Sequence, residues 1–360
     1  MSSLSARIYT ELVEQNYTSH GPAKLPILTY HRILPSPDPL QPNAITASQF
    51  EKQVKLLAAH FTLLPLEEAV WKLRYDRLPD RAAVITLDDS YRETRSIAAP
   101  ILQHAKKPAI SFLSTEHLYV GQKSSLMFSD AIIEMIRQTT CPVIDLSAIN
   151  GPILPCHSHA HKLTAISTIT KFAKYQSELQ RTETLSVLSH VSKVNLAKTA
   201  PRIMMSPEEV RELGWLGLTL GGHTHSHPIL TQITPEQAIK DISFNRQILQ
   251  QLSPNPLRAF AYPNGKYNDD VHPSHVELIK KTGYDFAVLT NSAIATAADN
   301  PLLLPRFETN ETGLRFIFRM IRMRNFTTHP AQQYQPTNPT APSTPPNTAT
   351  STPSSLLPQA

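Results

Sequence analysis

The stretch Ala82-Ala83-Val84-Ile85-Thr86-Leu87-Asp88-Asp89 ends a short apolar run with two adjacent carboxylates. A run of this length and composition predicts a strand buried on both faces, as strands of parallel sheets are. The strand would carry Asp88 and Asp89 at its C-terminal end. Because an Asp-Asp pair is by itself more typical of a solvated turn or a helix start, its meaning depends on the rest of the chain.

A second polar cluster, His223-Thr224-His225-Ser226-His227, follows a predicted strand at residues 218–221. Two imidazoles four residues apart, together with one carboxylate, make the ligand set of an open catalytic metal site. Such a site leaves positions for water and substrate, and the other carboxylate of the pair is free to act as a base on that water. The H-x-x-x-H spacing alone is unspecific, so the prediction depends on both clusters together.

The composition supports a large folded unit. The chain has 360 residues, of which 41% are hydrophobic, enough for a sizeable core in one domain with insertions or in two domains. The net charge of +5 and the pI near 9.1 are mild, and the basic residues are scattered, which argues against nucleic-acid binding. The densest basic stretch, residues 315–324, has the pattern of an amphipathic helix with one solvated face.

Targeting signals are absent from the sequence pattern. The N-terminus lacks the apolar core of a secretory signal, and no apolar run reaches about 18 residues, so we expect a cytoplasmic protein without a membrane span. Cys141 and Cys156 are expected to be free thiols, although an oxidising compartment would allow them to pair. The sequence does not specify the oligomeric state.

Short apolar runs alternate with helical patterns, which predicts a parallel α/β fold. Ser48 is expected to cap the first helix, and Ser206 and Thr234 begin two later helices with capping boxes. The predicted strands are 25–30, 82–87, 108–113, 218–221, 259–262, 286–289 and a short extended piece at 302–306. The predicted helices are 47–60, 91–105, 129–139, one near 165–192, 207–213, 235–252 and 275–282.

Polar residues recur directly after these predicted strands. In a closed parallel barrel the C-terminal strand ends meet at one rim, where such enzymes place their chemistry. We therefore expect one site that combines His31, Asp88, Asp89, His223, Asn264 and Arg306.

These segments resemble the motifs of the polysaccharide deacetylase family, which carries the NodB homology domain and forms carbohydrate esterase family 4. Residues 85–91 are similar to its T-F-D-D-G signature, residues 222–228 to its H-[ST]-x-x-H-P motif, and residues 260–265 to its third motif. Residues 28–32 resemble the opening strand of the exopolysaccharide-deacetylase branch. The resemblance covers about residues 25–310, apart from an intermediate region, and three motifs in the family's order make it specific.

The resemblance implies a distorted (β/α)7 barrel of the NodB type. The spacing from Asp89 to His223 is long for the family, so we expect an insertion at about residues 120–200, either a flap over the substrate groove or a structural addition. The implied organisation is a polar lead-in at residues 1–24, the deacetylase domain at 25–330 with this insertion, and a disordered Pro/Thr/Ser-rich tail at 331–360.

The resemblance also implies a mechanism. Asp89, His223 and His227 would hold a divalent metal ion, zinc first, with cobalt, nickel and iron as alternatives. Metal-bound water would attack the carbonyl of an N-acetyl group on an amino sugar, with Asp88 as general base. The backbone N–H of Asn264 would stabilise the oxyanion, and the products would be acetate and a free amino sugar.

The chain departs from the family pattern at several positions. Ser90 replaces the glycine of the first motif and must accept a backbone turn that glycine eases. Ala261 stands where much of the family has an arginine that steadies the base. No L-x-H motif follows, so the usual general acid is missing, and His31 or a water molecule would have to replace it.

Several residues keep two interpretations. His31 would be either a pocket residue or a histidine satisfied beside Tyr30, and Arg306 would either orient Asp88 or pair with Glu308. His225 would be a flanking residue or, on a straight strand, a third imidazole ligand. His157, His159 and His161 could bind metal but are more simply part of a solvated loop. Trp215 and Tyr262 could stack on a sugar ring but are more simply core residues.

The sequence thus predicts a metal-dependent hydrolase that removes N-acetyl groups from amino sugars of a polysaccharide or glycan precursor. Two rival hypotheses stay open: hydrolysis of another C–N bond, as in a formamide or ureide, and a catalytically silent sugar-binding protein. The missing acid motif keeps the hypothesis of a silent protein open, and the retained Asp88 argues against it.

Overall fold

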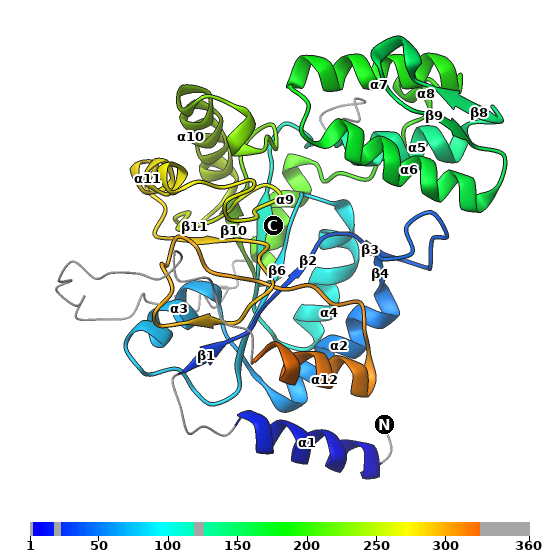
Figure 1. The fold of residues 1–360 in the computed structure, drawn as a ribbon. Helices are drawn as coiled ribbons and strands as arrows, with labels where there is room; N and C mark the ends of the chain where they lie inside the picture. The colour runs from blue at the N-terminus through cyan, green and yellow to red at the C-terminus, as the bar shows by residue number, and fades with distance from the viewer. Residues whose placement is uncertain (1–2, 18–22, 119–125, 325–360) are drawn as a thin grey trace, which may run out of the picture.

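A parallel sheet of seven strands forms the centre of the molecule (Figure 1). The computed structural model describes residues 3–17, 23–118 and 126–324. The strand order is β12-β11-β10-β7-β6-β2, with β5 beside the start of β6, and every pairing within the sheet is parallel. The strands are β2 (Ile27–Tyr30), β5 (Thr62–Leu63), β6 (Ala82–Leu87), β7 (Ala109–Leu113), β10 (Leu218–Gly222), β11 (Ala259–Ala261) and β12 (Phe286–Val288).

An extended segment at residues 301–307 joins the two edges of this sheet. On one side the Leu304 N–H donates to the Ala287 carbonyl beside β12 at 2.9 Å. On the other side the Phe307 N–H donates to the Ile27 carbonyl at 3.1 Å, and the Thr29 N–H of β2 donates back to Phe307 at 3.0 Å. The curled sheet and this segment form the distorted α/β barrel that the sequence predicts, and the segment contains the predicted extended piece at 302–306.

Helices pack around the barrel, and most begin where the sequence predicts. Ser206 and Thr234 cap α9 and α10 with complete capping boxes. The cap of α2 is Thr46 rather than Ser48, because the Thr46 hydroxyl accepts from the Gln49 N–H while the Gln49 side chain accepts from the Thr46 N–H. These helices are α2 (Ala47–His60), α3 (Leu66–Arg74), α4 (Ala99–His104), α9 (Pro207–Trp215), α10 (Pro235–Leu252), α11 (Pro273–Lys281) and α12 (Gly313–Met323).

Two prolines explain where the structure departs from the predicted elements. Pro26 divides the predicted first strand into β1 (Lys24–Leu25), which pairs antiparallel with β13 (Ala295–Thr296), and β2 of the barrel. Pro100 removes a helical donor from the helix that follows β6, and a π-helical turn at Thr94–Ala98 precedes α4. The remaining short strands are β3 (Ile33–Leu34) and β4 (Ile45–Thr46).

The N-terminal segment forms a helix rather than an unstructured lead-in. Helix α1 (Ser3–Tyr17) packs against α2 and the amphipathic helix α12, and buries Val13 and Tyr9. Helix α12 buries Phe316, Ile317, Met320 and Met323, so the amphipathic prediction is confirmed. Among the helices of the described residues, none has both the length and the apolar character needed to cross a bilayer. The predicted tail at 331–360 lies outside the described residues.

Residues 126–200 form a separate helical group beside the barrel, green in Figure 1. It has its own apolar core, which includes Ile132, Ile169 and Leu188. The single helix predicted near 165–192 is two helices, because the chain leaves helical geometry after Lys174 and Ser177 caps a new helix. The elements are α5 (Phe128–Gln138), β8 (Val143–Asp145), β9 (Ile153–Pro155), α6 (His159–Lys174), α7 (Glu178–Ser192) and α8 (Leu196–Thr199).

A buried polar cluster fastens this inserted group to the barrel. The Tyr91 hydroxyl, just beyond β6, donates to Asp130 Oδ2 of α5 at 3.0 Å. Arg32, just beyond β2, lies with Nη1 3.6 Å from Asp130 Oδ1 and its guanidinium 5.0 Å from the centre of the Tyr91 ring. Burial raises the pKa of Asp130 to about 7, against the opposing effects of Arg32 and Tyr91.

This cluster predicts a pH-dependent stability. Folded Asp130 keeps its proton up to about pH 7, whereas the unfolded chain releases it near pH 4. The folded state therefore binds one proton more in that window, and its free energy of unfolding falls as pH rises, on the order of 1 kcal/mol per pH unit. Urea titrations between pH 4.5 and about 7 should show a weaker decline in Asp130→Asn, which keeps an acceptor for Tyr91. Equal pH slopes in the two proteins would contradict this expectation.

Candidate metal and catalytic site

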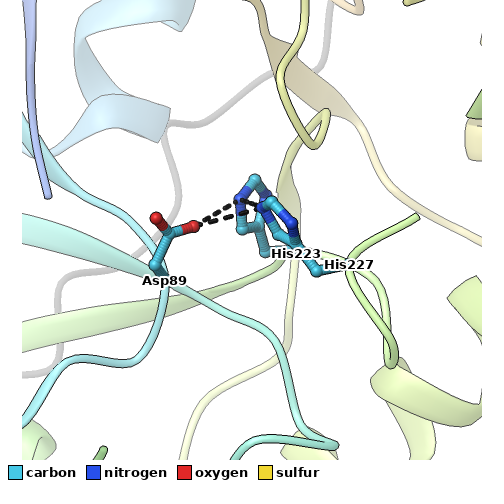
Figure 2. A group of neighbouring side chains, drawn as sticks. All are labelled: Asp89, His223 and His227. Atoms are coloured by element: carbon cyan, nitrogen blue, oxygen red, sulfur yellow. Dashed lines mark hydrogen bonds and ion pairs between the residues drawn. The ribbon is translucent and has the colours of Figure 1, made fainter. Parts of the chain in front are cut away.

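Three side chains from distant parts of the chain point at one another at the rim of the barrel (Figure 2). Asp89 Oδ1 lies 3.1 Å from His223 Nε2 and 3.3 Å from His227 Nε2. The two Nε2 atoms are 3.2 Å apart. Among the described residues, this is the one group of three or more His, Cys, Asp or Glu side chains whose ligand atoms converge in this way.

The geometry of the three atoms fits a metal ion. His223 Nδ1 lies 2.7 Å from the Ala261 carbonyl, which can only accept, so Nδ1 carries a hydrogen and Nε2 is the ring atom turned toward Asp89. Ligand atoms of a tetrahedral zinc site with bonds near 2.1 Å are separated by about 3.4 Å, close to the three spacings found here. These residues could therefore hold a divalent cation with coordination positions left open.

The end of β6 separates the two aspartates. The Asp88 N–H donates to the Tyr30 carbonyl of β2 at 2.8 Å, and the Asp89 N–H donates to the Phe112 carbonyl of β7 at 3.1 Å. The chain then turns through left-handed conformations at Asp89 and Ser90, with φ of 77° and 62°. Ser90 accepts the turn expected of it, and its hydroxyl donates to the Ser114 carbonyl at 2.8 Å.

The histidine loop, residues 223–227, requires a glycine directly before it. A Cβ on Gly222 would lie 2.1 Å from the Tyr284 hydroxyl, so a larger residue would displace the strand that leads to His223. Thr224 and His227 then adopt left-handed φ of 63° and 55°. The Thr224 hydroxyl donates to the His223 carbonyl, as the sequence suggests for a residue that fixes a turn.

His225 does not join Asp89, His223 and His227, which we call the metal group. Its Nδ1 lies 2.8 Å from the Thr115 hydroxyl, and its ring packs edge-on against Phe244 with centroids 4.6 Å apart. The left-handed Thr224 ends the alternation of a straight strand, so His223 and His225 do not share a face. The structure therefore places His225 as a flanking residue.

Arg306 holds Asp88 through a bidentate ion pair. Its Nη1 and Nη2 lie 2.8 and 2.7 Å from Asp88 Oδ1 and Oδ2, and both side chains are buried. Burial acts to raise the pKa of Asp88, but the Arg306 guanidinium lowers it by more, so the net shift is downward. Of the two roles open for Arg306, the structure shows pairing with Asp88 and not with Glu308.

His31 lies on the opposite side of Asp88 and faces the cavity. Its Nε2 is 4.0 Å from Asp88 Oδ2, and its Nδ1 is 3.2 Å from Glu308 Oε1. About a third of the side chain is exposed, so His31 is a pocket residue rather than one satisfied beside Tyr30. Burial acts to lower the pKa of His31, and the carboxylates of Asp89, Asp88 and Glu308 outweigh it, so the net shift is upward.

All seven residues predicted for the site line one cavity or support its floor. The cavity has a volume of about 630 Å³ and is lined by His31, Asp88, Asp89, His223, His227 and Asn264, with Arg306 buried behind Asp88. Asn264 has a left-handed φ of 59°, which asparagine tolerates better than most residues, and its carbonyl accepts from the Thr290 hydroxyl. No acceptor among the described residues takes the Asn264 N–H.

Sequence reasoning missed two residues of α10 that hold the histidine loop. Asp241 accepts from the backbone N–H groups of His225 and Ser226, at 2.5 and 3.1 Å. Asn245 accepts from the His223 N–H at 3.3 Å and donates to the Leu113 carbonyl at 2.9 Å. The available signal was a polar residue within the apolar period of this helix, in which Ala238, Ile242, Asn245 and Leu249 are buried.

The other candidates lie apart from the metal group. Trp215 is 80% exposed at the end of α9 and does not line the cavity. Tyr262 lines the cavity but is itself buried, with its hydroxyl bonded to the Leu302 carbonyl at 3.0 Å. The rings of His157 and His161 pack edge-on near the start of α6, with their centroids 4.2 Å apart. They belong to no converging ligand set among the described residues.

The sequence is similar to those of known proteins. Residues 181–287, which include the histidine loop and the third motif, match a family model described as polysaccharide deacetylase. The chain is 22% identical over 277 residues to the poly-β-1,6-N-acetyl-D-glucosamine N-deacetylase of Staphylococcus aureus, covering 77% of this chain and 71% of that protein.

Solved structures share the fold. The Streptococcus pyogenes deacetylase PplD in complex with acetate has a TM-score of 0.54 and 19% identity, covering 84% of this chain and 99% of that one. IcaB from Ammonifex degensii has a TM-score of 0.53 and 17% identity, covering 84% and 97%.

The converging ligand atoms predict metal binding that a single substitution abolishes. After dialysis against zinc, the protein should retain about one ion per chain by mass spectrometry of the metal, and its melting temperature should rise with added zinc. Asp89→Asn and His227→Ala should lose both effects, whereas His225→Gln should keep them. Wild-type zinc stoichiometry in both ligand variants would exclude this site.

Proposed function

Because this chain belongs to the polysaccharide deacetylase family, we propose that it is a metal-dependent hydrolase that removes N-acetyl groups from the amino sugars of a polysaccharide or glycan precursor. One observation carries the proposal: the group of Asp89, His223 and His227 shares a cavity with Asp88, a buried base that Arg306 holds in place. A sugar-binding protein without catalysis would gain nothing from a buried carboxylate that faces a metal group.

Asp88 is the base in this proposal. A divalent ion held by Asp89, His223 and His227 would lower the pKa of water and polarise the acyl carbonyl. Asp88 then takes the proton of the attacking water as its oxygen bonds to the carbonyl carbon. The lowered pKa of Asp88 keeps it ionised, and therefore able to accept that proton, at neutral pH.

Arg306 is a positioning residue for this step. Its two parallel hydrogen bonds fix the plane of the Asp88 carboxylate, which leaves the outer lone pairs for the water. The guanidinium also takes the place of the arginine that the family supplies at the position of Ala261. The same charge thus comes from the segment that closes the barrel instead of from the third motif.

Asn264 and His31 complete the chemistry. Asn264 lines the cavity, and its N–H has no acceptor among the described residues, so this N–H is suited to stabilise the oxyanion as the carbonyl becomes tetrahedral. When the C–N bond breaks, the nitrogen leaves as an amine only if it gains a proton. His31 is suited to donate it from Nε2, because Nδ1 is occupied by Glu308.

The test of this function is acetate release from N-acetylglucosamine tetramers by the zinc-loaded protein. Asp88→Asn should reduce kcat by about 100-fold or more while zinc content stays at the wild-type level. Asp76→Asn, at an exposed aspartate with a left-handed φ of 53°, is the matched control and should keep full activity. Loss of acetate release together with loss of zinc in Asp88→Asn would assign Asp88 to the metal instead. Absence of acetate release by the wild-type enzyme, both from this tetramer and from charged N-acetylated glycans, would refute the proposed function.

The proposed role of His31 predicts that its substitution affects substrates differently according to their leaving group, because an acid is needed only for a poor leaving group. His31→Gln should lower kcat on the N-acetylglucosamine tetramer by about 100-fold and should leave hydrolysis of 4-nitrophenyl acetate nearly unchanged, since nitrophenolate departs unprotonated. Glu308→Gln, which keeps a hydrogen-bond partner for Nδ1, should have a smaller effect on the tetramer. Equal losses on both substrates would show that His31 acts in binding or folding and not as the acid.

A further inference from the structure

The acidic groups of the catalytic cavity all have partners. Asp88 pairs with Arg306, and Glu308 pairs with His31. Asp89 faces the two imidazoles of the metal group. Each of these carboxylates therefore already has a basic side chain as its partner.

Three further cations line the same cavity. They come from separate elements: Lys174 from α6 of the inserted group, Lys266 from the loop after β11, and Arg319 from α12. None of them forms an ion pair with a carboxylate of the described residues. The Lys174 ammonium lies over an aromatic ring, with its Nζ 5.0 Å from the centre of Tyr175.

The cavity next to this one differs in charge. The adjoining cavity shares Met127, Phe128 and His227 with it but carries the acidic residues Glu116, Glu178 and Asp241. Among the residues that line this second cavity, Arg181 carries the opposing positive charge. Three cations without carboxylate partners in one cavity attract an anionic ligand more than a neutral or cationic one, because only an anion offsets their mutual repulsion.

We propose that the substrate is an anionic glycan, in which a carboxylate or phosphate lies beside the N-acetylated sugar and binds Lys174, Lys266 and Arg319. This inference rests on the proposed function and specifies its substrate class. Charge-assisted bonds from an arginine and two lysines suit either anion, because both present oxygen acceptors. Lys174 would bring the inserted group into direct contact with the substrate.

The test compares glycans of matched size and different charge. The hyaluronan tetrasaccharide alternates glucuronate with N-acetylglucosamine, and the chitin tetrasaccharide is neutral. A second pair, N-acetylglucosamine 1-phosphate and N-acetylglucosamine, tests whether a phosphate is preferred. The zinc-loaded enzyme should show a kcat/KM for acetate release at least about tenfold higher on one anionic probe than on its neutral match, with the preference shrinking in about 0.5 M NaCl.

Variants connect that preference with two of the three cations. Lys266→Gln and Arg319→Gln should each reduce the anionic-to-neutral ratio of kcat/KM by about fivefold or more. Arg315→Gln removes the same charge from the same helix one turn away, outside the cavity, and should leave the ratio unchanged. A ratio near one in the wild type, or the same ratio in all variants, would overturn the inference while leaving the proposed function standing.

A binding measurement separates the two proposals if no probe releases acetate. Calorimetry should then detect the hyaluronan tetrasaccharide binding more tightly than the chitin tetrasaccharide, with the difference reduced in Arg319→Gln. That result would sustain an anionic ligand and reject deacetylation. Failure to bind either anionic probe would reject the anionic ligand too.

Discussion

The ion pair between Arg306 and Asp88 is the interaction on which the barrel and the site both depend. The Arg306 side chain is completely buried, and its donors reach Leu289 after β12 at 3.0 Å, Thr86 within β6 at 2.9 Å and Asp88. In the sheet, β6 and β12 are separated by β7, β10 and β11, so this one guanidinium connects strands across the barrel interior. Because a buried guanidinium without its carboxylate costs about 3–5 kcal/mol, ionised Asp88 stabilises the closing segment in its observed position.

The same pair explains how two adjacent buried carboxylates coexist. Neighbouring acids in a site of low dielectric ordinarily share one charge, because repulsion raises the pKa of one of them. Here each has its own compensation: burial acts to raise both pKa values, but Arg306 lowers that of Asp88, and hydrogen bonds with His223 and His227 lower that of Asp89. The backbone turn at Asp89 directs the two side chains to these different partners. The proposed base and the candidate metal ligand thus have separate partners although they are consecutive in the chain.

Much of this arrangement could be predicted from the sequence because its signals are local. The apolar run before Asp88, the capping boxes at Ser206 and Thr234, and the polar residues after strands all depend on a few neighbouring positions. The rim of a parallel barrel then brings Asp89, His223 and His227 together without further information.

What the sequence could not supply depends on contacts between distant residues. Nothing near His31 indicates that Glu308 binds it, and the support that Asp241 gives the histidine loop exists only after α10 has packed. The left-handed Thr224, which turns His225 away from the metal group, has no sequence signal because threonine rarely adopts that conformation. The break between α6 and α7 has the same character, since each half is a good helix by itself.

The division between the barrel and the inserted group separates chemistry from substrate shape. Every group proposed to act on the acyl bond comes from the barrel, at the ends of its strands or in its closing segment. The inserted group contributes Phe128 and Ser129 of α5 and Thr170 and Lys174 of α6 to the same cavity. Its attachment through Asp130 to Tyr91 and Arg32, each close in sequence to a site residue, fixes that wall relative to Asp89 and His31. If the proposed function holds, a change in the inserted group would therefore alter which glycan fits, whereas a change at the rim would alter whether the bond is cut.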